Sequence, residues 1–279
     1  GEITIADNQG VWLRIKGAKI DWTRSALLTG AVSVNALSAD SVTILRQPIP
    51  APSSLTPEAV PWSLPELPVS VKIDTIKIAR LVIEKPVMGV PATLMASAAL
   101  QLDADGIRVS LDAKRLVGGE GALHLALSQT RATRLLDIDL KISEPEQGLV
   151  VTALDIAGKP PLSVSLQGKG SLDDVAIALD VSTSTPKIIK GLIKLKKTEI
   201  GQTVSGSFDG DISALVAPNY RDFFAGTSAL TLFAIAQPEG GYAIPELRLK
   251  TGGFDLRADM ATEADGFIST LNLQARLAS

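Results

Sequence analysis

Only a few side chains in this sequence are of the types that catalyse reactions or hold metals. His124 is the single histidine of the 279 residues and cysteine is absent, which excludes His-pair metal sites, thiol nucleophiles and zinc ribbons. Asp137 and Asp139 are spaced like paired carboxylates for acid–base chemistry. Such a pair needs a desolvated cleft to separate its pKa values, whereas the surrounding alternation puts both aspartates beside Lys141 on a polar face. We therefore expect solvated charges here, with His124 on the polar face as well.

Two glycine-containing motifs resemble parts of ion- or phosphate-binding loops. Asp103, Asp105 and Gly106 match half of a calcium-binding loop, but the later ligands and the closing glutamate are missing. Gly168-Lys169-Gly170 is a lone G-x-G between two strand patterns. We interpret the first as a hairpin turn and the second as a strand end. Walker, G-x-S-x-G, H-E-x-x-H and complete G-x-G-x-x-G motifs are absent, so the sequence predicts no enzyme active site.

Charge and composition exclude further classes of protein. With 27 basic and 30 acidic residues, a net charge of -3 and no long run of Lys or Arg, nucleic-acid binding is not expected. No apolar stretch reaches the roughly 18 to 20 residues of a membrane-spanning helix. The lack of cysteine suits an oxidising compartment. Because the chain starts with Gly1, we expect a fragment or a processed form, from which an anchor or a signal could have been removed.

Strict alternation of apolar and polar residues is the dominant pattern. Segments such as 107–112, 136–143, 162–167 and 175–181 put aliphatic residues on one side and polar residues on the other. A period of two repeated this often predicts half-buried antiparallel strands, and the Asp-Gly and Gly-Gly pairs between them predict hairpin turns. We expect an all-β, mainly antiparallel fold with about 14 to 16 strands. From residue 69 onward the strands should follow one another as a meander.

The apolar residues of segment 69–84 change phase twice, near Thr75 and near Arg80. A β-bulge adds one residue to a strand and so restores the side to which the following side chains point. We therefore predict a bulge or a bend at each position, which keeps all the apolar side chains of this segment on one face.

Three parts follow one another along the chain. Residues 1–47 carry the N-terminal strands and a short helix, and residues 69–279 carry the main run of strands, with helices near 143–157 and 213–224. Residues 48–68 are dense in proline, which cannot donate to a strand ladder, so we predict an extended connection there. Strands, a helical stop and strands again indicate a loose internal repeat. The helices are too few to cover so much sheet.

Two arrangements of the strands fit this pattern. Two sheets could bury their apolar faces against each other as a sandwich, which is the usual solution for alternating strands. The alternative is one long sheet, curled along its length, whose inner face is filled by something other than protein. Sandwich cores usually contain aromatic anchors, whereas aromatic residues make up only 4% of this chain. Composition leaves both arrangements open, and in the second the apolar face itself is the candidate functional surface.

Four segments of the chain resemble one protein family. Ala6–Leu13, Asp21–Gly30 and Val32–Arg46 are similar to the N-terminal part of TamB proteins, and Ala217–Phe224 resembles a recurring helical insert of that family. TamB proteins are AsmA-like and are related in architecture to bridge-like lipid-transfer proteins built from repeating β-groove units. The resemblance implies an elongated, curled β-sheet groove (a β-taco) with a few short helices.

The resemblance also implies a location and partners. TamB proteins are periplasmic, are held in the inner membrane by an N-terminal helix, and bind a TamA-type outer-membrane barrel through a C-terminal region. Neither the anchor nor that docking region is recognisable in this chain, which looks like an internal segment near the N-terminal part of the family. Both contacts therefore belong to regions that we do not expect within it.

The function implied by the resemblance is a bridge that carries phospholipid acyl chains between the inner and outer membranes and supports outer-membrane biogenesis. A chaperone-like scaffold for outer-membrane proteins and a structural β-solenoid or adhesin fragment are the alternatives. We expect no cofactor and no metal, and phospholipid or another acyl-chain molecule as the ligand. The aliphatic and aromatic side chains expected to line the groove are Ile107, Val109, Leu111, Leu136, Ile138, Leu140, Leu162, Val164, Leu166, Val175, Ile177, Leu179, Val204, Phe208, Leu247, Leu249, Phe254, Leu256, Leu271 and Leu273.

Overall fold

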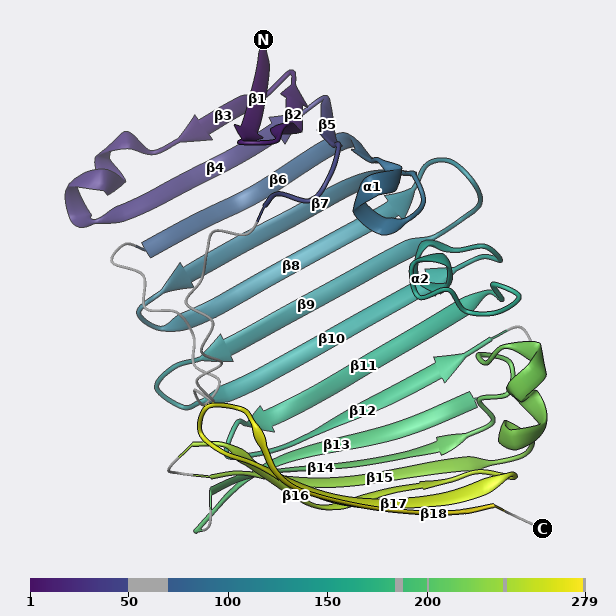
Figure 1. Ribbon diagram of the computed structural model, residues 1–279. Helices are drawn as coiled ribbons and strands as arrows, with labels where there is room; N and C mark the ends of the chain where they lie inside the picture. The colour runs from purple at the N-terminus through teal and green to yellow at the C-terminus, as the bar shows by residue number, and fades with distance from the viewer. Residues whose placement is uncertain (50–69, 184–187, 200, 238–239, 278–279) are drawn as a thin grey trace.

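The strands of this chain form one sheet. The computed structural model describes residues 1–49, 70–183, 188–199, 201–237 and 240–277. Within them, all 18 strands belong to a single long sheet, which is mixed but mostly antiparallel (Figure 1). The described strands therefore do not form the sandwich of two sheets. Of the predicted proline-rich connection, residues 50–68 lie outside the described residues.

The larger part of the sheet is a meander, as the alternation predicts. Each strand from β6 onward pairs antiparallel with the strand that follows it. These strands are β6 (Ser70–Ile83), β7 (Ala92–Asp103), β8 (Gly106–Arg115), β9 (Ala122–Thr130), β10 (Leu135–Glu144), β11 (Leu162–Ser171), β12 (Asp174–Ser182), β13 (Ile188–Thr198), β14 (Gly201–Gly210), β15 (Ser228–Ala236), β16 (Tyr242–Lys250), β17 (Phe254–Thr262) and β18 (Ile268–Leu277).

The N-terminal strands are joined differently. They are β1 (Glu2–Asp7), β2 (Gly10–Lys16), β3 (Lys19–Trp22), β4 (Ala31–Ala39) and β5 (Ser41–Ile44). β4 and β5 pair in parallel with successive parts of β6, β3 pairs with β4, and β2 pairs with β5 and β1. Parallel strands need a crossover connection, which accounts for the long segment between β5 and β6. The sheet has more strands than expected because β3 and β5, with 4 residues each, are too short to show alternation.

Both bulges predicted in segment 69–84 are confirmed. The register of β6 against β7 shifts between Ile73 and Ile76 and again between Ile78 and Leu81. Each shift adds one residue to β6 relative to β7. The apolar side chains before and after the shift, which are isoleucines and one leucine, therefore point to the same face.

The helix in segment 143–157 is shorter than predicted. α2 spans only Leu149–Ala153, because β10 continues to Glu144. The Glu144 carboxylate accepts hydrogen bonds from the backbone N–H groups of Leu149 and Val150 at 2.9 and 2.8 Å. It thereby satisfies two of the N–H groups that have no partner within the helix. The end of one strand thus fixes the start of the helix.

The other helices are single turns or 3-10 helices. In segment 213–224 the helix η2 begins only at Pro218 and ends at Phe224, because proline, which lacks an N–H, fits the first turn and not the interior. The short N-terminal helix is η1 (Arg24–Thr29), which ends at Gly30 in the left-handed conformation. α1 (Lys85–Met88) was not expected from the sequence.

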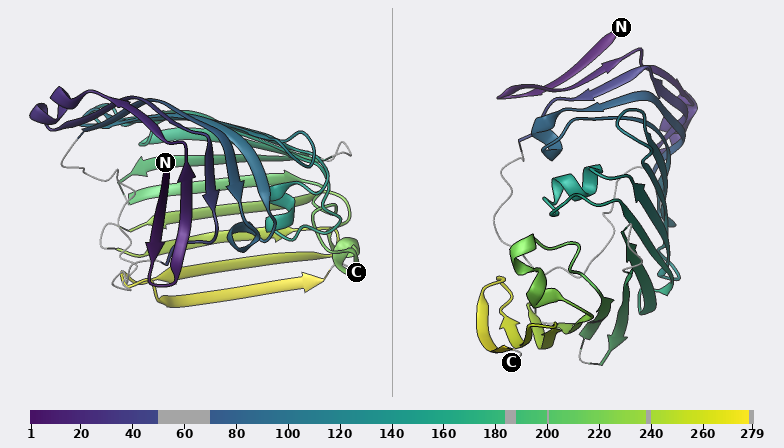
Figure 2. Two further views of the ribbon diagram at one scale, coloured as in Figure 1. Left: turned by 90° about the horizontal axis from the view of Figure 1, so that it is seen from above. Right: turned by 90° about the vertical axis from the view of Figure 1, so that its right-hand side faces the viewer.

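Three of the helices follow one another at regular intervals in the sheet. α1 follows β6, α2 follows β10 and η2 follows β14, so each is separated from the next by four strands. All three lie at the same end of the strands, on the right in Figure 1, and on the same side of the sheet in the right-hand view of Figure 2. The opposite end of the meander carries short turns. The structure therefore has a repeat of four strands and a helical connection, in which α1, and not the predicted N-terminal helix η1, is the first helical connection.

Little of the chain is fully buried. Among the described residues the buried hydrophobic side chains are Val34, Ala92, Leu136, Leu149, Val151, Leu162, Leu172 and Val175. Leu136, Leu172 and Val175 form a small cluster, against which Leu127, Ile177 and Leu195 pack. This cluster lies near the short-turn end of β10 to β13, and the remaining aliphatic side chains of the sheet stay partly exposed.

Candidate functional site

The register of the sheet gathers the apolar side chains on one face. Residues paired across neighbouring strands point to the same side of a sheet. From β3 to β18, one residue of each strand except β5 connects to the next in an unbroken row: Trp22, Val34, Ile73, Leu100, Val109, Leu127, Ile138, Gly168, Ile177, Ile193, Gly206, Leu232, Leu247, Ala258 and Leu273. We call the side of the sheet that carries this row the apolar face.

All the side chains expected to line a groove lie on the apolar face. On β8, β10 to β12, β14 and β16 to β18, each of them either belongs to the row or is separated from the row's residue on the same strand by an even number of positions. Such residues point to the same face of a strand. Leu136, Leu162 and Val175 are buried, Leu271 and Leu273 are 57% and 62% exposed, and the others are half-buried. The structure therefore brings the whole expected set together on one surface.

Sequence reasoning missed part of this surface. On β13, Ile193 and Leu195 alternate with lysines, and on β15, Leu230 and Leu232 continue the same face. Their alternation is as clear as that of the residues selected. In the N-terminal strands the signal is weaker, because bulges and short strands interrupt the period of two. In these strands the members of the row are Trp22 on β3 and Val34 on β4.

The apolar face carries polar side chains only near strand ends. In the described strands these include Gln129 and Gln202 at the short-turn end, and Arg115 and Glu144 at the end that carries the helices. The two glutamines donate to nearby backbone carbonyls, at 2.9 and 3.2 Å. Between the two ends the face consists of aliphatic side chains, glycine, methionine and Phe208.

The helices lie on the side of the apolar face. The ring of Phe224 in η2 meets the ring of Phe254 in β17 edge to face, with 5.5 Å between centroids. In α2, Leu149 and Val151 are buried. Because α1, α2 and η2 share one side of the sheet (Figure 2), all three cover this face only at one end of the strands. Over the rest of the face, the described part of the chain provides no second layer of strands.

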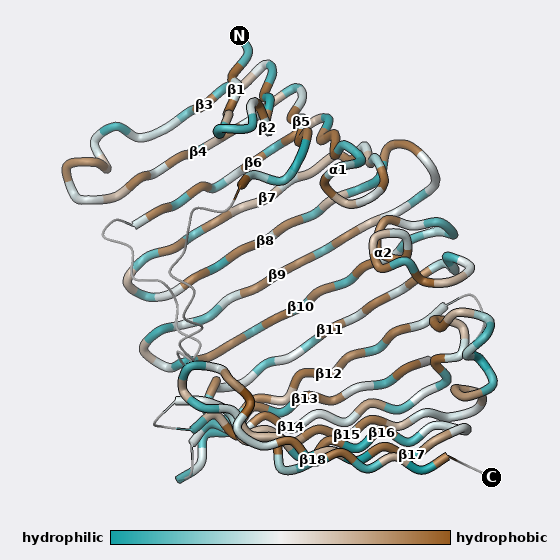
Figure 3. The backbone as a smooth tube through the Cα atoms, in the orientation of Figure 1, coloured by the Kyte–Doolittle hydropathy of each residue, from teal (hydrophilic) through white to brown (hydrophobic). Residues whose placement is uncertain are grey.

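The opposite side, which we call the polar face, carries a second row on the same strands. It consists of Lys19, Ser38, Lys77, Ser97, Asp112, His124, Lys141, Ser165, Asp180, Lys190, Asp209, Ala229, Lys250, Asp255 and Arg276. In two stretches of this row acidic and basic residues face each other across neighbouring strands: Asp180, Lys190 and Asp209 in the first, and Lys250, Asp255 and Arg276 in the second. The contrast between the two faces follows the strands in Figure 3, where hydrophobic and hydrophilic positions alternate.

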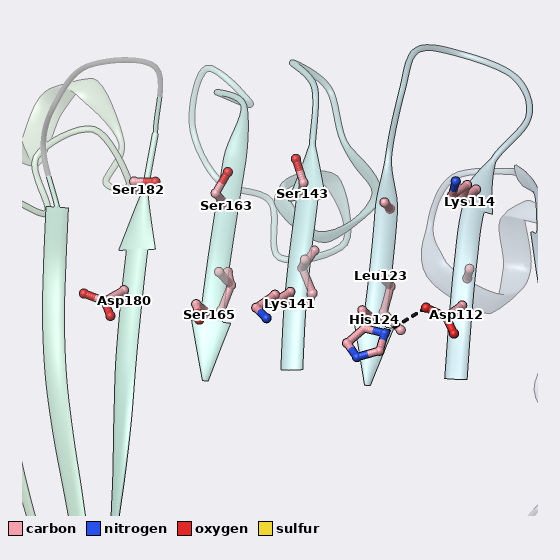
Figure 4. A pocket seen from close by; sticks show the side chains of 14 residues that line it. Asp112, Lys114, Leu123, His124, Lys141, Ser143, Ser163, Ser165, Asp180 and Ser182 are labelled. Carbon is pink, nitrogen blue, oxygen red and sulfur yellow. Dashed lines mark hydrogen bonds and ion pairs between the residues drawn. The ribbon is translucent and has the colours of Figure 1, made fainter. Parts of the chain in front are cut away.

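The polar face has two hollows, and the first contains His124 and Lys141. One, of about 500 Å³, is lined by side chains of β8 to β12 (Figure 4), and one of about 520 Å³ adjoins it over β4 and β6 to β8. In the first, His124 Nδ1 lies 2.8 Å from Asp112 Oδ1, and both side chains are about half exposed. No serine hydroxyl in the described part of the chain hydrogen-bonds to this histidine. The arrangement is a solvated pair without an activated nucleophile.

The carboxylate pair is also solvated, as predicted. Asp139 accepts from Lys141 at 2.9 Å and from Gln167 at 3.1 Å, and these hydrogen bonds lower the pKa of the Asp139 carboxyl. Asp137 pairs with Lys169 at 2.9 Å, which raises the pKa of that lysine. Each aspartate thus has its own cationic partner, so the two do not share a proton.

The half calcium loop is a hairpin turn, as predicted. Asp103 Oδ1 accepts from the N–H groups of Asp105 and Gly106 at 2.9 and 3.2 Å, and Gln101 donates to the other oxygen. The hydrogen bond from Gln101 is the main reason that the pKa of the Asp103 carboxyl is lowered. Among the described residues no group of three His, Cys, Asp or Glu side chains could hold a metal ion.

None of the helices in the described ranges is long and apolar enough to cross a membrane. Comparison of the chain with protein-family models, with curated proteins and with solved structures found no match.

Proposed function

We propose that this chain is a segment of a periplasmic lipid conduit of the TamB kind, in which the apolar face curls into a groove that carries phospholipid acyl chains. The observation that carries the proposal is the unbroken apolar row from Trp22 to Leu273, which lacks any polar side chain. Among the described residues, the helices cover this face only at one end of the strands. Large continuous apolar surfaces on proteins are binding surfaces, and between the two ends of its strands this one offers no polar group that would orient a polar ligand.

An aliphatic surface matches the energetics of lipid transfer. Moving an acyl chain into water costs about 0.8 kcal/mol per CH₂, so a tail of about 16 carbons faces roughly 12 kcal/mol. Passing from a bilayer to an aliphatic groove costs close to nothing, because both surroundings are hydrocarbon-like. Even, weak contact along the whole row allows a tail to slide without being trapped at one position.

The dimensions of the sheet suit one part of a bridge between membranes. Strands are about 4.8 Å apart, so the row from β3 to β18 extends over about 70 Å. The curved path of the ribbon in Figure 2, with the helices on its inner side, supports a groove as the form of the apolar face. A lipid head group would remain in water along the open side.

Lipid extraction tests this proposal directly. The purified chain, extracted with organic solvent and analysed by mass spectrometry, should yield phospholipid, whereas a structural solenoid or adhesin should yield none. Ile138→Asp combined with Ile177→Asp puts two charges in the middle of the apolar row, and we expect this variant to lose most of the bound lipid.

A matched control lies on β12, the strand that carries Ile177. Ala176→Asp with Ala178→Asp adds the same charge on either side of Ile177, but on the polar face, where both alanines are exposed. This control should keep its lipid. Circular dichroism must show that both variants retain the sheet. Equal lipid content in a folded Ile138→Asp/Ile177→Asp variant and in its control would rule out the apolar face as the carrier.

A further inference from the structure

We propose that Arg115, at the end of β8, binds the phosphate group of a phospholipid whose acyl chains lie on the apolar face. This inference rests on the proposed function and adds a position for the lipid head group. The feature that carries it is a cation at one end of the apolar face, beside the loop 116–121, for which the described residues provide no anion.

The guanidinium of Arg115 is partly buried and unpaired. Arg115 points to the apolar face because it shares the strand β8 with Val109 and is separated from it by an even number of positions. Its Nε and Nη1 atoms are buried without a hydrogen-bond partner, whereas Nη2 is not buried. Burying a charge without a partner is costly, so this side chain favours the binding of an anion.

The acidic residues closest to Arg115 in the strand order do not neutralise it. Gly121, whose carbonyl accepts from the Arg115 backbone N–H at 2.7 Å, has no side chain to offer. Glu144, on the apolar face two strands away, has both oxygens bonded to N–H groups of α2. Glu120, in the loop itself, is exposed and forms no ion pair with a described residue. The charge of the guanidinium is therefore available to a ligand.

The loop 116–121 brings further donors close to the guanidinium. Gly118 and Gly119 have φ angles of +87° and +101°, in the left-handed region that favours glycine. A Cβ at Gly118 would be only 2.7 Å from Nη2 of Arg115, so glycine allows the loop to approach this closely. The backbone N–H groups of residues 117–120 donate to no residue in the described ranges. Unpaired backbone N–H groups beside a guanidinium are donors suited to phosphate oxygens.

The position of Arg115 suits the phosphate of a lipid. The loop 116–121 joins β8 to β9, between α1, which follows β6, and α2, which follows β10 (Figure 1). Residues 116–120 are exposed, whereas Leu94, which pairs with Arg115 on β7, belongs to the apolar face. A phosphate at Arg115 would thus lie where the apolar face meets water. A phospholipid has its phosphate at the same boundary, between its tails and the solvent.

Two lipids with identical tail-labelled acyl chains test the assignment by fluorescence titration. Phosphatidylglycerol carries the phosphate and diacylglycerol lacks it. We expect the unchanged chain to bind phosphatidylglycerol about tenfold more tightly than diacylglycerol, and Arg115→Met to lose this preference. Methionine keeps an unbranched apolar stem, so the binding of diacylglycerol should not change. Lys114→Met is the matched control, because it removes the same charge from the neighbouring position on the polar face. It should keep the preference.

The outcomes separate this inference from the proposed function. An equal preference for phosphatidylglycerol in Arg115→Met and in the unchanged chain would overturn the role of Arg115 while acyl chains still bind. Failure of both lipids to bind would overturn the proposed function, and this inference with it. Inorganic phosphate provides the third arm. If the lipid-free chain binds it through Arg115 as tightly as it binds phosphatidylglycerol, the site belongs to a free ion and the head-group assignment is wrong.

Urea denaturation of the lipid-free chain excludes a purely structural role. Because Arg115→Met removes an uncompensated charge, we expect this variant to be at least as stable as the unchanged chain. A clear loss of stability in Arg115→Met, absent from Lys114→Met, would show that the guanidinium holds the fold together, and would overturn the inference.

Discussion

The two faces of the sheet are made by the same strands, and they differ in whether a side chain needs one particular partner on the neighbouring strand. On the apolar face a slip of two residues between strands would replace one aliphatic contact with another. On the polar face the same slip would separate Asp180 from Lys190 and Lys190 from Asp209, which face each other in the register observed. The polar face and the short turns therefore specify the register, and the apolar face supplies most of the buried area.

The apolar face itself is not uniform. Leu136 and Val175 are only 7% and 2% exposed, whereas most of the side chains on this face remain half-exposed. Stability is thus concentrated in a small cluster, and under our proposal the rest of the face holds acyl chains.

The largest effect should come from the cluster. Leu136→Ala removes a side chain that packs with Leu172 and Val175, and we expect it to lower the free energy of unfolding by about 2 to 4 kcal/mol. The same change on the polar face, Leu192→Ala, affects a side chain that is 36% exposed and should cost about 1 kcal/mol or less. Urea denaturation of the two variants measures the difference. Equal losses would mean that burial on the apolar face does not stabilise the sheet.

A smaller effect is expected where glycine lies beneath an aromatic ring. A Cβ at Gly191 would be 2.6 Å from Cε1 of Phe208, and one at Gly206 would be 3.1 Å from Cε2. The ring thus occupies the space that a side chain at either glycine would need. Gly191→Ala should cost about 1 to 3 kcal/mol in thermal or urea unfolding, because the ring must move. Phe208→Leu in the same chain should recover part of the loss; strictly additive effects would show that the ring does not limit this site.

The smallest effect belongs to the polar face and depends on pH. The pKa of Asp139 is lowered by the hydrogen bonds from Lys141 and Gln167, so its ionised form stabilises the folded state. That contribution is complete above the ordinary aspartate pKa of about 3.9 and disappears as the pH falls through the lowered value. Asp139→Asn should therefore be less stable than the unchanged chain at neutral pH and approach it in acid. A constant difference in unfolding free energy across this range would contradict the assignment.

Much of the candidate site could be predicted from the sequence because alternation is a local property. Val109 and Ile138, like the other expected lining residues, share a face for no other reason than the period of two, and the phase shifts in β6 revealed its bulges. Helix lengths were less predictable. Ser143 and Glu144 fit the start of a helix, yet they remain in β10 because β11 pairs with both residues and β9 pairs with Ser143.

The sequence by itself determined which side chains of each strand point the same way, because successive residues of a strand alternate whatever its partners are. Only the tertiary structure decided that these strands join in one sheet, that β4 and β5 run parallel to β6, and that helices follow every fourth strand of the meander. Those features depend on which edges meet over long distances in the chain. The same alternating strands could have closed on a second sheet, and no local pattern distinguishes the two outcomes.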